Sequence, residues 1–364
     1  KIWDEDADGQ GLRGLTRLPV PLPAPHWVRT YAASLSAENI LKSAAEEFRA
    51  HRLSIHLPGG ETPNWEAFFA LSTRASAIEL LLSGARSSEI SMRFLMPYPV
   101  AAAWREWGVS RGPDKQMRTG LAFAENLAAL VVAVAGATLS HSGARKPLRF
   151  LRSLEKQLPR GVSFDFLRNV IERELFLDWQ DASPSSPLPP LLGGPLAAAL
   201  QGPLALRNAE SHLRLPKDEA ERETLLSTLN ADISEIMQLT EPLASVWLVQ
   251  IEEAVNDPLL RRCEKYSGRV LAGDHPLGFL HDGRDVDQLL LPGNLYLRFP
   301  DETWISAAPF LMPKVSSDPW EMDLGVIDGR TPDGQLRFRS LFGRGEWIGP
   351  RATAQFSELS KVAE

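Results

Sequence analysis

The sequence predicts a mainly α-helical protein with a C-terminal β part, and three observations lead to this fold class. From residue 101 to residue 243, apolar side chains recur at the spacing of amphipathic helices. After Pro242, short β-branched and aromatic runs replace that periodicity. The chain has 364 residues, 44% of them hydrophobic and 23% charged, which excludes wholesale disorder and allows two or three separate cores.

The first hundred residues predict a tail followed by a small domain. Residues 1–26 join an acidic run to a proline-rich run, a composition typical of an extended tail or linker. Residues 27–100 carry helical patterns over 36–49 and 65–83, which favour a small α or α+β domain without recognisable chemistry. The chain opens on a lysine rather than a methionine, so we expect a piece of a longer protein whose upstream domains are missing.

Residues 101–243 predict a helical bundle. A single apolar stripe of Leu225, Leu229, Ile233 and Ile236 indicates the last of its helices. The loop at 183–195 is too rich in proline and glycine for regular structure. The expected helices cover about 116–139, 145–158, 163–178, 198–213 and 217–240.

Residues 244–364 predict a small antiparallel β domain. The runs 246–251 and 295–299 are rich in β-branched and aromatic residues. Asp333-Gly334 lies between two further runs and is a hairpin signal.

Charge, cysteine content and hydropathy narrow the function classes. The net charge of −7 argues against a protein that coats nucleic acid generally, because phosphate binding depends on Lys and Arg. One cysteine excludes an internal disulfide and a Cys-based zinc cluster, which fits a reducing cytoplasm. The most apolar run, 127–137, is shorter than the roughly 20 residues that cross a bilayer. We therefore expect a cytoplasmic protein with no membrane contact, metal site or cofactor.

One polar segment of the bundle could carry chemistry. Asn208 and His212 stand four residues apart, so a helix places them on the same face. Arg207 lies roughly 140° from His212 around that helix, so these two side chains do not share a face. A second Arg-Asn pair, Arg168-Asn169, has no histidine in the same range after it, and we interpret it as structural.

The string Arg207-Asn208-Ala-Glu-Ser-His212 resembles the motif of the HEPN family: an arginine, an adjacent polar residue, and a histidine four to six positions after the arginine. The resemblance covers about residues 100–243. It implies a homodimer, or a pair with a homologous bundle, in which two motifs face each other. Active members are metal-independent endoribonucleases, and the resemblance implies an RNA partner and a prokaryotic toxin or antiviral defence system.

The resemblance gives each motif residue a role with a physical basis. His212 would exchange protons with the RNA 2′-OH or the leaving oxygen. Arg207 would stabilise charge on the scissile phosphate. Asn208 would orient His212 from one turn away. The alternative is a HEPN-like dimerisation or sensor module of a larger signalling or defence protein that cleaves nothing.

A basic stripe precedes the motif. Arg145, Arg149, Arg152 and Lys156 fall on one face of the expected helix at 145–158, with Lys146 beside them. The stripe is a candidate surface for RNA or for an acidic partner, and alone it would support a nucleic-acid-binding regulator. It equally fits a solvated amphipathic face. The opposite face holds Leu148, Leu151, Leu154 and Leu158.

Overall fold

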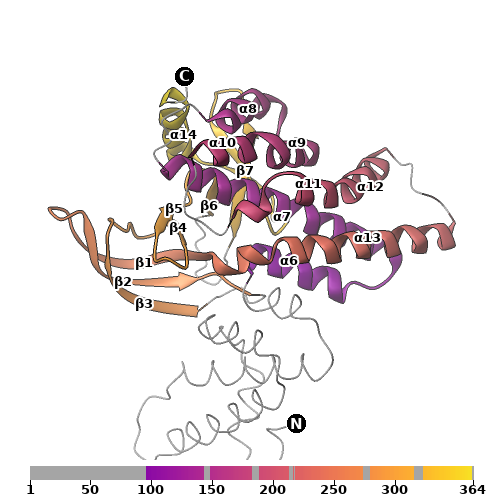
Figure 1. Ribbon diagram of the computed structural model, residues 1–364, viewed down its shortest axis with the longest axis horizontal. Helices are drawn as coiled ribbons and strands as arrows, with labels where there is room; N and C mark the ends of the chain where they lie inside the picture. Colours follow the sequence, from indigo (N-terminus) through magenta and orange to yellow (C-terminus); the bar gives the residue numbers. More distant parts are fainter. Residues whose placement is uncertain are drawn as a thin grey trace, which may run out of the picture.

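The computed structural model combines helices with a C-terminal antiparallel β part. The predicted tail at 1–26 and nearly all of the predicted N-terminal domain at 27–100 lie outside the described residues. Figure 1 shows helices leading into two sheets, with one further helix at the end of the chain. The structure describes residues 96–142, 148–182, 188–212, 216, 218–273, 279–314 and 323–362.

The long helix α7 (Pro113–His141) forms the centre of the helical part. It begins with proline at its first position, where the missing N–H costs no hydrogen bond. Helices α6 (Tyr98–Val109) and α13 (Glu219–Leu239) pack against it. A Cβ on Gly120 would lie only 3.0 Å from Ile233, so glycine lets α7 and α13 approach closely.

The predicted stripe on α13 is confirmed. Leu229, Ile233 and Ile236 are buried, and Leu225 is half-buried at the edge of the core. Burial of this stripe fixes which face of α13 meets α7.

The segment predicted as one helix at 163–178 is three successive helical pieces. Ser163 caps its start by accepting the Phe166 N–H at 3.2 Å. The middle piece, η2, is a π-helical turn inserted in the α-helix. The pieces that follow α7 are α8 (Arg149–Gln157), η1 (Leu158–Arg160), α9 (Phe164–Asn169), η2 (Val170–Glu174) and α10 (Leu175–Ala182).

The predicted helix at 198–213 is also divided. Helix α11 (Gly194–Ala199), which follows η3 (Pro189–Leu191), ends at Leu200, and α12 (Gln201–Ser211) begins directly after it. His212 is therefore the C-cap residue of α12, one position after its last helical residue, Ser211. After α13, η4 (Glu241–Ser245) leads into the first strand.

The β part consists of two antiparallel sheets. The first has the order β3-β2-β1-β4-β5, and the second has the order β6-β7-β8-β9. The predicted runs at 246–251 and 295–299 become β1 and β4, which pair directly. Asp333-Gly334 forms the predicted turn between β7 and β8, with Gly334 at φ +84°. The strands are β1 (Trp247–Asp257), β2 (Arg262–Val270), β3 (Phe279–Val286), β4 (Leu295–Arg298), β5 (Trp304–Ser306), β6 (Leu311–Pro313), β7 (Leu324–Arg330), β8 (Leu336–Ser340) and β9 (Glu346–Ile348).

A C-terminal helix, α14 (Pro350–Val362), follows the strands. The sequence was expected to continue in strands and turns here, and that expectation was wrong. Ala352 and Phe356, four residues apart, are both buried, so α14 has the apolar face of an amphipathic helix.

Helices and sheets share one hydrophobic core. Phe310, between β5 and β6, packs against Phe150 of α8 at 5.6 Å between ring centroids and against Phe356 of α14 at 6.4 Å. A Cβ on Gly136 of α7 would lie 3.0 Å from the Phe150 ring, so this junction is closely packed. The hydrophobic core therefore continues across the change from helix to strand near residue 244.

Helix α7 is long and apolar enough to cross a membrane by length and composition. The expectation that no stretch is long enough to cross a bilayer was therefore wrong. It counted only the run at 127–137 and left out the small and weakly polar residues on both sides of that run. Of the most apolar stretch of α7, 89% is buried inside the structure.

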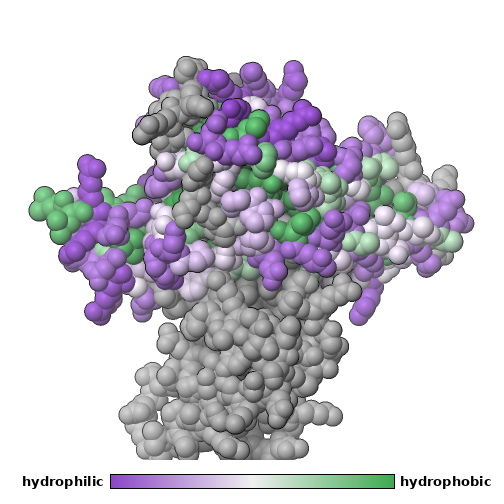
Figure 2. Space-filling view, viewed as in Figure 1, coloured by the Kyte–Doolittle hydropathy of each residue, from purple (hydrophilic) through white to green (hydrophobic). Residues whose placement is uncertain are grey.

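The β1–β2 hairpin projects from the molecule with an apolar tip. Leu259 is 94% exposed and Leu260 is 62% exposed. Figure 2 shows this hydrophobic tip at the left end of the molecule. The turn itself is ordered by Asp257, whose carboxylate accepts the N–H groups of both leucines.

Candidate functional site

The end of α12 carries the three motif residues. The N–H of His212 donates to the Asn208 carbonyl at 3.2 Å, which closes the last turn. The Ser211 hydroxyl donates to the Arg207 carbonyl at 2.6 Å and strengthens the same turn. The side chains of Asn208 and His212 are exposed, one turn apart.

Arg207 points away from this exposed pair, toward α7. Its Nη1 donates to Oε2 of Glu210 at 2.8 Å, and its Nε lies 3.7 Å from Oε2 of Glu125. Two carboxylates therefore hold one guanidinium, whose side chain remains 46% exposed. Structure and spacing agree that Arg207 and His212 do not converge on one point within a single copy.

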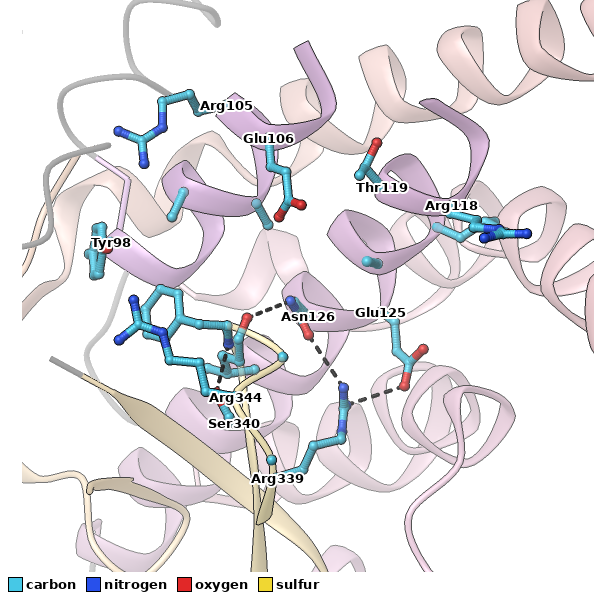
Figure 3. A pocket seen from close by; sticks show the side chains of 18 of the residues that line it. Tyr98, Arg105, Glu106, Arg118, Thr119, Glu125, Asn126, Arg339, Ser340 and Arg344 are labelled. Carbon is cyan, nitrogen blue, oxygen red and sulfur yellow. Dashed lines mark hydrogen bonds and ion pairs between the residues drawn. The ribbon is translucent and has the colours of Figure 1, made fainter. Parts of the chain in front are cut away.

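Glu125 connects α12 to the second sheet. Its other oxygen, Oε1, lies 3.2 Å from Nη2 of Arg339 on β8. Arg339 also donates to the neighbouring Asn126 at 3.4 Å, and Asn126 donates to the Leu341 carbonyl at 2.8 Å. Figure 3 shows Glu125, Asn126 and Arg339 turned toward one another. The chain of contacts joins α12, α7 and β8.

These contacts form one side of a cavity of about 1000 Å³, which we call the arginine cavity. Its walls come from α6, α7 and α12, and from the end of β8, the start of β9 and the loop between them (residues 341–345). Arg207 lines it, whereas Asn208 and His212 do not. Its charged side chains are Arg105, Glu106, Arg118, Glu125, Arg207, Glu210, Arg339, Arg344 and Glu346.

Another part of the cavity wall is aromatic. Tyr98 and Phe342 lie 4.9 Å apart between ring centroids, and the Arg344 guanidinium lies 5.6 Å from the Phe342 ring. Three residues of the cavity were not predicted as site residues from the sequence: Arg118, Arg339 and Arg344. The one sequence signal was the Phe342-Gly-Arg-Gly345 string, a glycine-rich turn that holds an arginine.

The basic stripe on α8 is partly used within the chain. Arg149 lies 3.1 Å from Asp178 and 2.9 Å from Asp181, both on α10. The hydrogen bond to Asp181, and more weakly the charge of both carboxylates, raises the pKa of Arg149 above its usual value. Arg152 and Lys156 are exposed, while Arg145 and Lys146 lie outside the described residues. The four predicted leucines, Leu148, Leu151, Leu154 and Leu158, are buried.

Arg168-Asn169 has the contacts of a structural pair, as the sequence indicated. Arg168 donates to the Ala197 carbonyl at 3.1 Å and to Asn169 at 2.8 Å. It also pairs with Glu172 at 3.2 Å. These contacts tie α9 to α11.

Among the described residues, no group of three or more His, Cys, Asp or Glu side chains is placed to hold a metal ion. No protein-family model, no curated protein and no solved structure matches this chain.

Proposed function

We propose that this chain is a metal-independent endoribonuclease of HEPN type that acts as a dimer, in a prokaryotic toxin or antiviral defence system. The observation that carries the proposal is the end of α12, where Asn208 and His212 are exposed on consecutive turns. Exposed polar residues one turn apart on a helix form a face that a second copy can meet. Such a pair brings two histidines to one RNA strand.

The proposed reaction breaks the P–O5′ bond of RNA. One His212 removes the proton from the 2′-OH, whose oxygen attacks the adjacent phosphorus. The second copy's histidine gives a proton to the departing 5′ oxygen. The products are a 2′,3′-cyclic phosphate and a 5′-hydroxyl, so atoms and protons balance. Arg207 stabilises the extra negative charge on the phosphate oxygens in the transition state.

The carboxylates around Arg207 favour a second candidate function. A guanidinium already paired with Glu125 and Glu210 must exchange or share these partners before it binds a phosphate. The same geometry suits a HEPN-like module that dimerises or senses a partner without cutting RNA. In that role Arg207 only fixes the end of α12 on α7.

RNA cleavage in EDTA separates the two functions, because the proposed chemistry uses only histidine and arginine side chains. Wild-type protein should cut single-stranded RNA and leave DNA of the same sequence intact, since DNA lacks the 2′-OH. His212→Ala should lower the cleavage rate about 10² to 10⁴-fold, and Arg207→Ala should also lower it strongly.

His141→Ala is the matched control, because His141 is another exposed histidine at a helix end, on α7. It should cut like wild type. Intact RNA under all conditions, or equal rates for His212→Ala and wild type, would reject the nuclease and leave the interaction module.

A further inference from the structure

The arginine cavity is locally positive in an acidic protein. Five arginines and four glutamates line it, whereas the whole chain carries a net charge of −7. An excess of arginine inside a concave site on a negative protein favours an anionic ligand. Its volume of about 1000 Å³ is large enough for a small-molecule ligand, for which cavities of roughly 300–1000 Å³ are usual.

The arginines on one wall are held in place before any ligand arrives. Glu210 contacts Arg207 through one oxygen at 2.8 Å and Arg118 through the other at 3.4 Å. Glu125 contacts Arg207 and Arg339 in the same way. Two carboxylates therefore position three guanidiniums, and Arg339 has a further partner in Asp328, whose Oδ1 lies 3.5 Å from its Nε.

These ion pairs leave donors for a ligand. Each guanidinium has five N–H donors, of which one carboxylate contact uses one or two. Arg118 is 76% exposed and Arg207 is 46% exposed, so both present unused edges toward solvent. Because the carboxylates already restrict these side chains, less conformational entropy is lost when an oxyanion binds.

The aromatic part of the wall suits a flat ring and a close approach of the backbone. Phe342 is half-buried and already packs against Tyr98 and Arg344, so a planar aromatic group can stack on the exposed Arg344 side chain and meet the part of the Phe342 ring that remains exposed. Gly343 and Gly345 have φ values of +69° and +100°. A Cβ on either glycine would meet nothing within 4 Å, so the main chain here borders open space.

We propose that the arginine cavity binds a nucleotide. Its phosphates lie on the wall of Arg118, Arg207 and Arg339, and its base lies against Phe342 and Arg344. This binding goes beyond RNA cleavage and does not depend on it, although the two sites share Arg207.

Isothermal titration calorimetry with ATP, without RNA present, tests the proposal on the full chain. Arg118→Ala removes an exposed arginine from the phosphate wall, and it should weaken ATP binding about tenfold through the loss of a charge-assisted contact. Arg111→Ala is the matched control, because Arg111 is exposed and does not line the cavity. It should bind ATP like wild type.

Tripolyphosphate and Phe342→Leu test the part of the proposal that concerns the base. Tripolyphosphate should bind more weakly than ATP, and Phe342→Leu should weaken ATP but not tripolyphosphate. No ATP binding at millimolar concentration, or equal affinities for Arg118→Ala and Arg111→Ala, would overturn the site. Equal binding of ATP and tripolyphosphate would overturn its assignment to nucleotides. These results leave the RNA cleavage experiment unaffected, because no RNA takes part in them.

Discussion

Asp178, on α10, caps the start of the neighbouring helix α8. Helix α8 begins after Leu148, which offers no capping side chain, so its first N–H groups need partners from elsewhere. The buried Asp178 carboxylate accepts the Phe150 N–H at 2.9 Å and the Arg149 guanidinium at 3.1 Å. It joins α8 to α10 through a hydrogen bond shielded from water.

Asp178→Ala should therefore lower the free energy of unfolding by about 1–3 kcal/mol, since it leaves a buried N–H without a partner. Asp181→Ala is the control, because Asp181 also contacts Arg149 but is 36% exposed. It should cost at most about 1 kcal/mol, as exposed ion pairs do. Urea denaturation measures both. Equal losses for the two variants would contradict the capping role of Asp178.

For single residues, the sequence predicted on which face of the helix each motif residue lies, but not which side chains it contacts. Helical spacing alone places Asn208 and His212 on one face and Arg207 on another, as the structure has them. The partner of Arg207 on α7 is Glu125, 82 positions earlier in the chain. Such a contact depends on how α7 and α12 pack, and no local pattern encodes that.

Sequence periodicity predicted the long helices correctly. It failed for the shorter helices, whose ends depend on packing against other elements. Helices α7 and α13 were predicted from their apolar patterns. The division at Leu200 was not, because both α11 and α12 are locally helical sequences. Gly193, at φ +95°, donates its N–H to the Ile171 carbonyl at 2.9 Å. This contact with η2 fixes the point at which α11 begins, and it joins residues 22 positions apart in the chain.

Strand β2 contains a buried tyrosine, and we expect its ionisation to destabilise the first sheet at high pH. Tyr266 is 3% exposed and packs edge-on against Trp304 at 5.1 Å. Burial raises the pKa of its hydroxyl to about 12, from an ordinary value of 10.0. The native state therefore holds this proton more tightly than the unfolded state. Its contribution to stability is complete below pH 10 and is lost as the pH rises toward 12.

Tyr266→Phe should remove this part of the pH dependence, because phenylalanine has no proton to lose. Between about pH 10 and 12, the free energy of unfolding should fall less steeply for the variant than for wild type. Urea titrations at a series of pH values measure the two slopes. Parallel slopes over this range would show that Tyr266 ionises equally easily in both states.

In the whole molecule, one hydrophobic core joins the helices to both sheets. Polar contacts also connect the helices to the second sheet. Asn126 on α7 bonds the Leu341 carbonyl, and Glu125 joins α12 to β8. The sequence predicted the order of the parts, helices followed by strands. It did not predict the arginine cavity, because the cavity depends on segments that are distant in the chain and meet only after folding. The helix α14 was also missed, although its buried residues Ala352 and Phe356 stand four positions apart, as in an amphipathic helix.

If two copies of the chain meet across the end of α12, cysteine cross-linking at position 212 should capture the dimer. The chain has one cysteine, Cys263, which is 0% exposed, so a His212→Cys variant adds an accessible thiol. With a short bis-maleimide linker, this variant should form a covalent dimer at tens of micromolar protein. Glu358→Cys, on the exposed face of α14, should remain largely monomeric. A His212→Cys protein that cross-links no better than Glu358→Cys, and that is a monomer in light scattering, would show that two copies do not meet at this point.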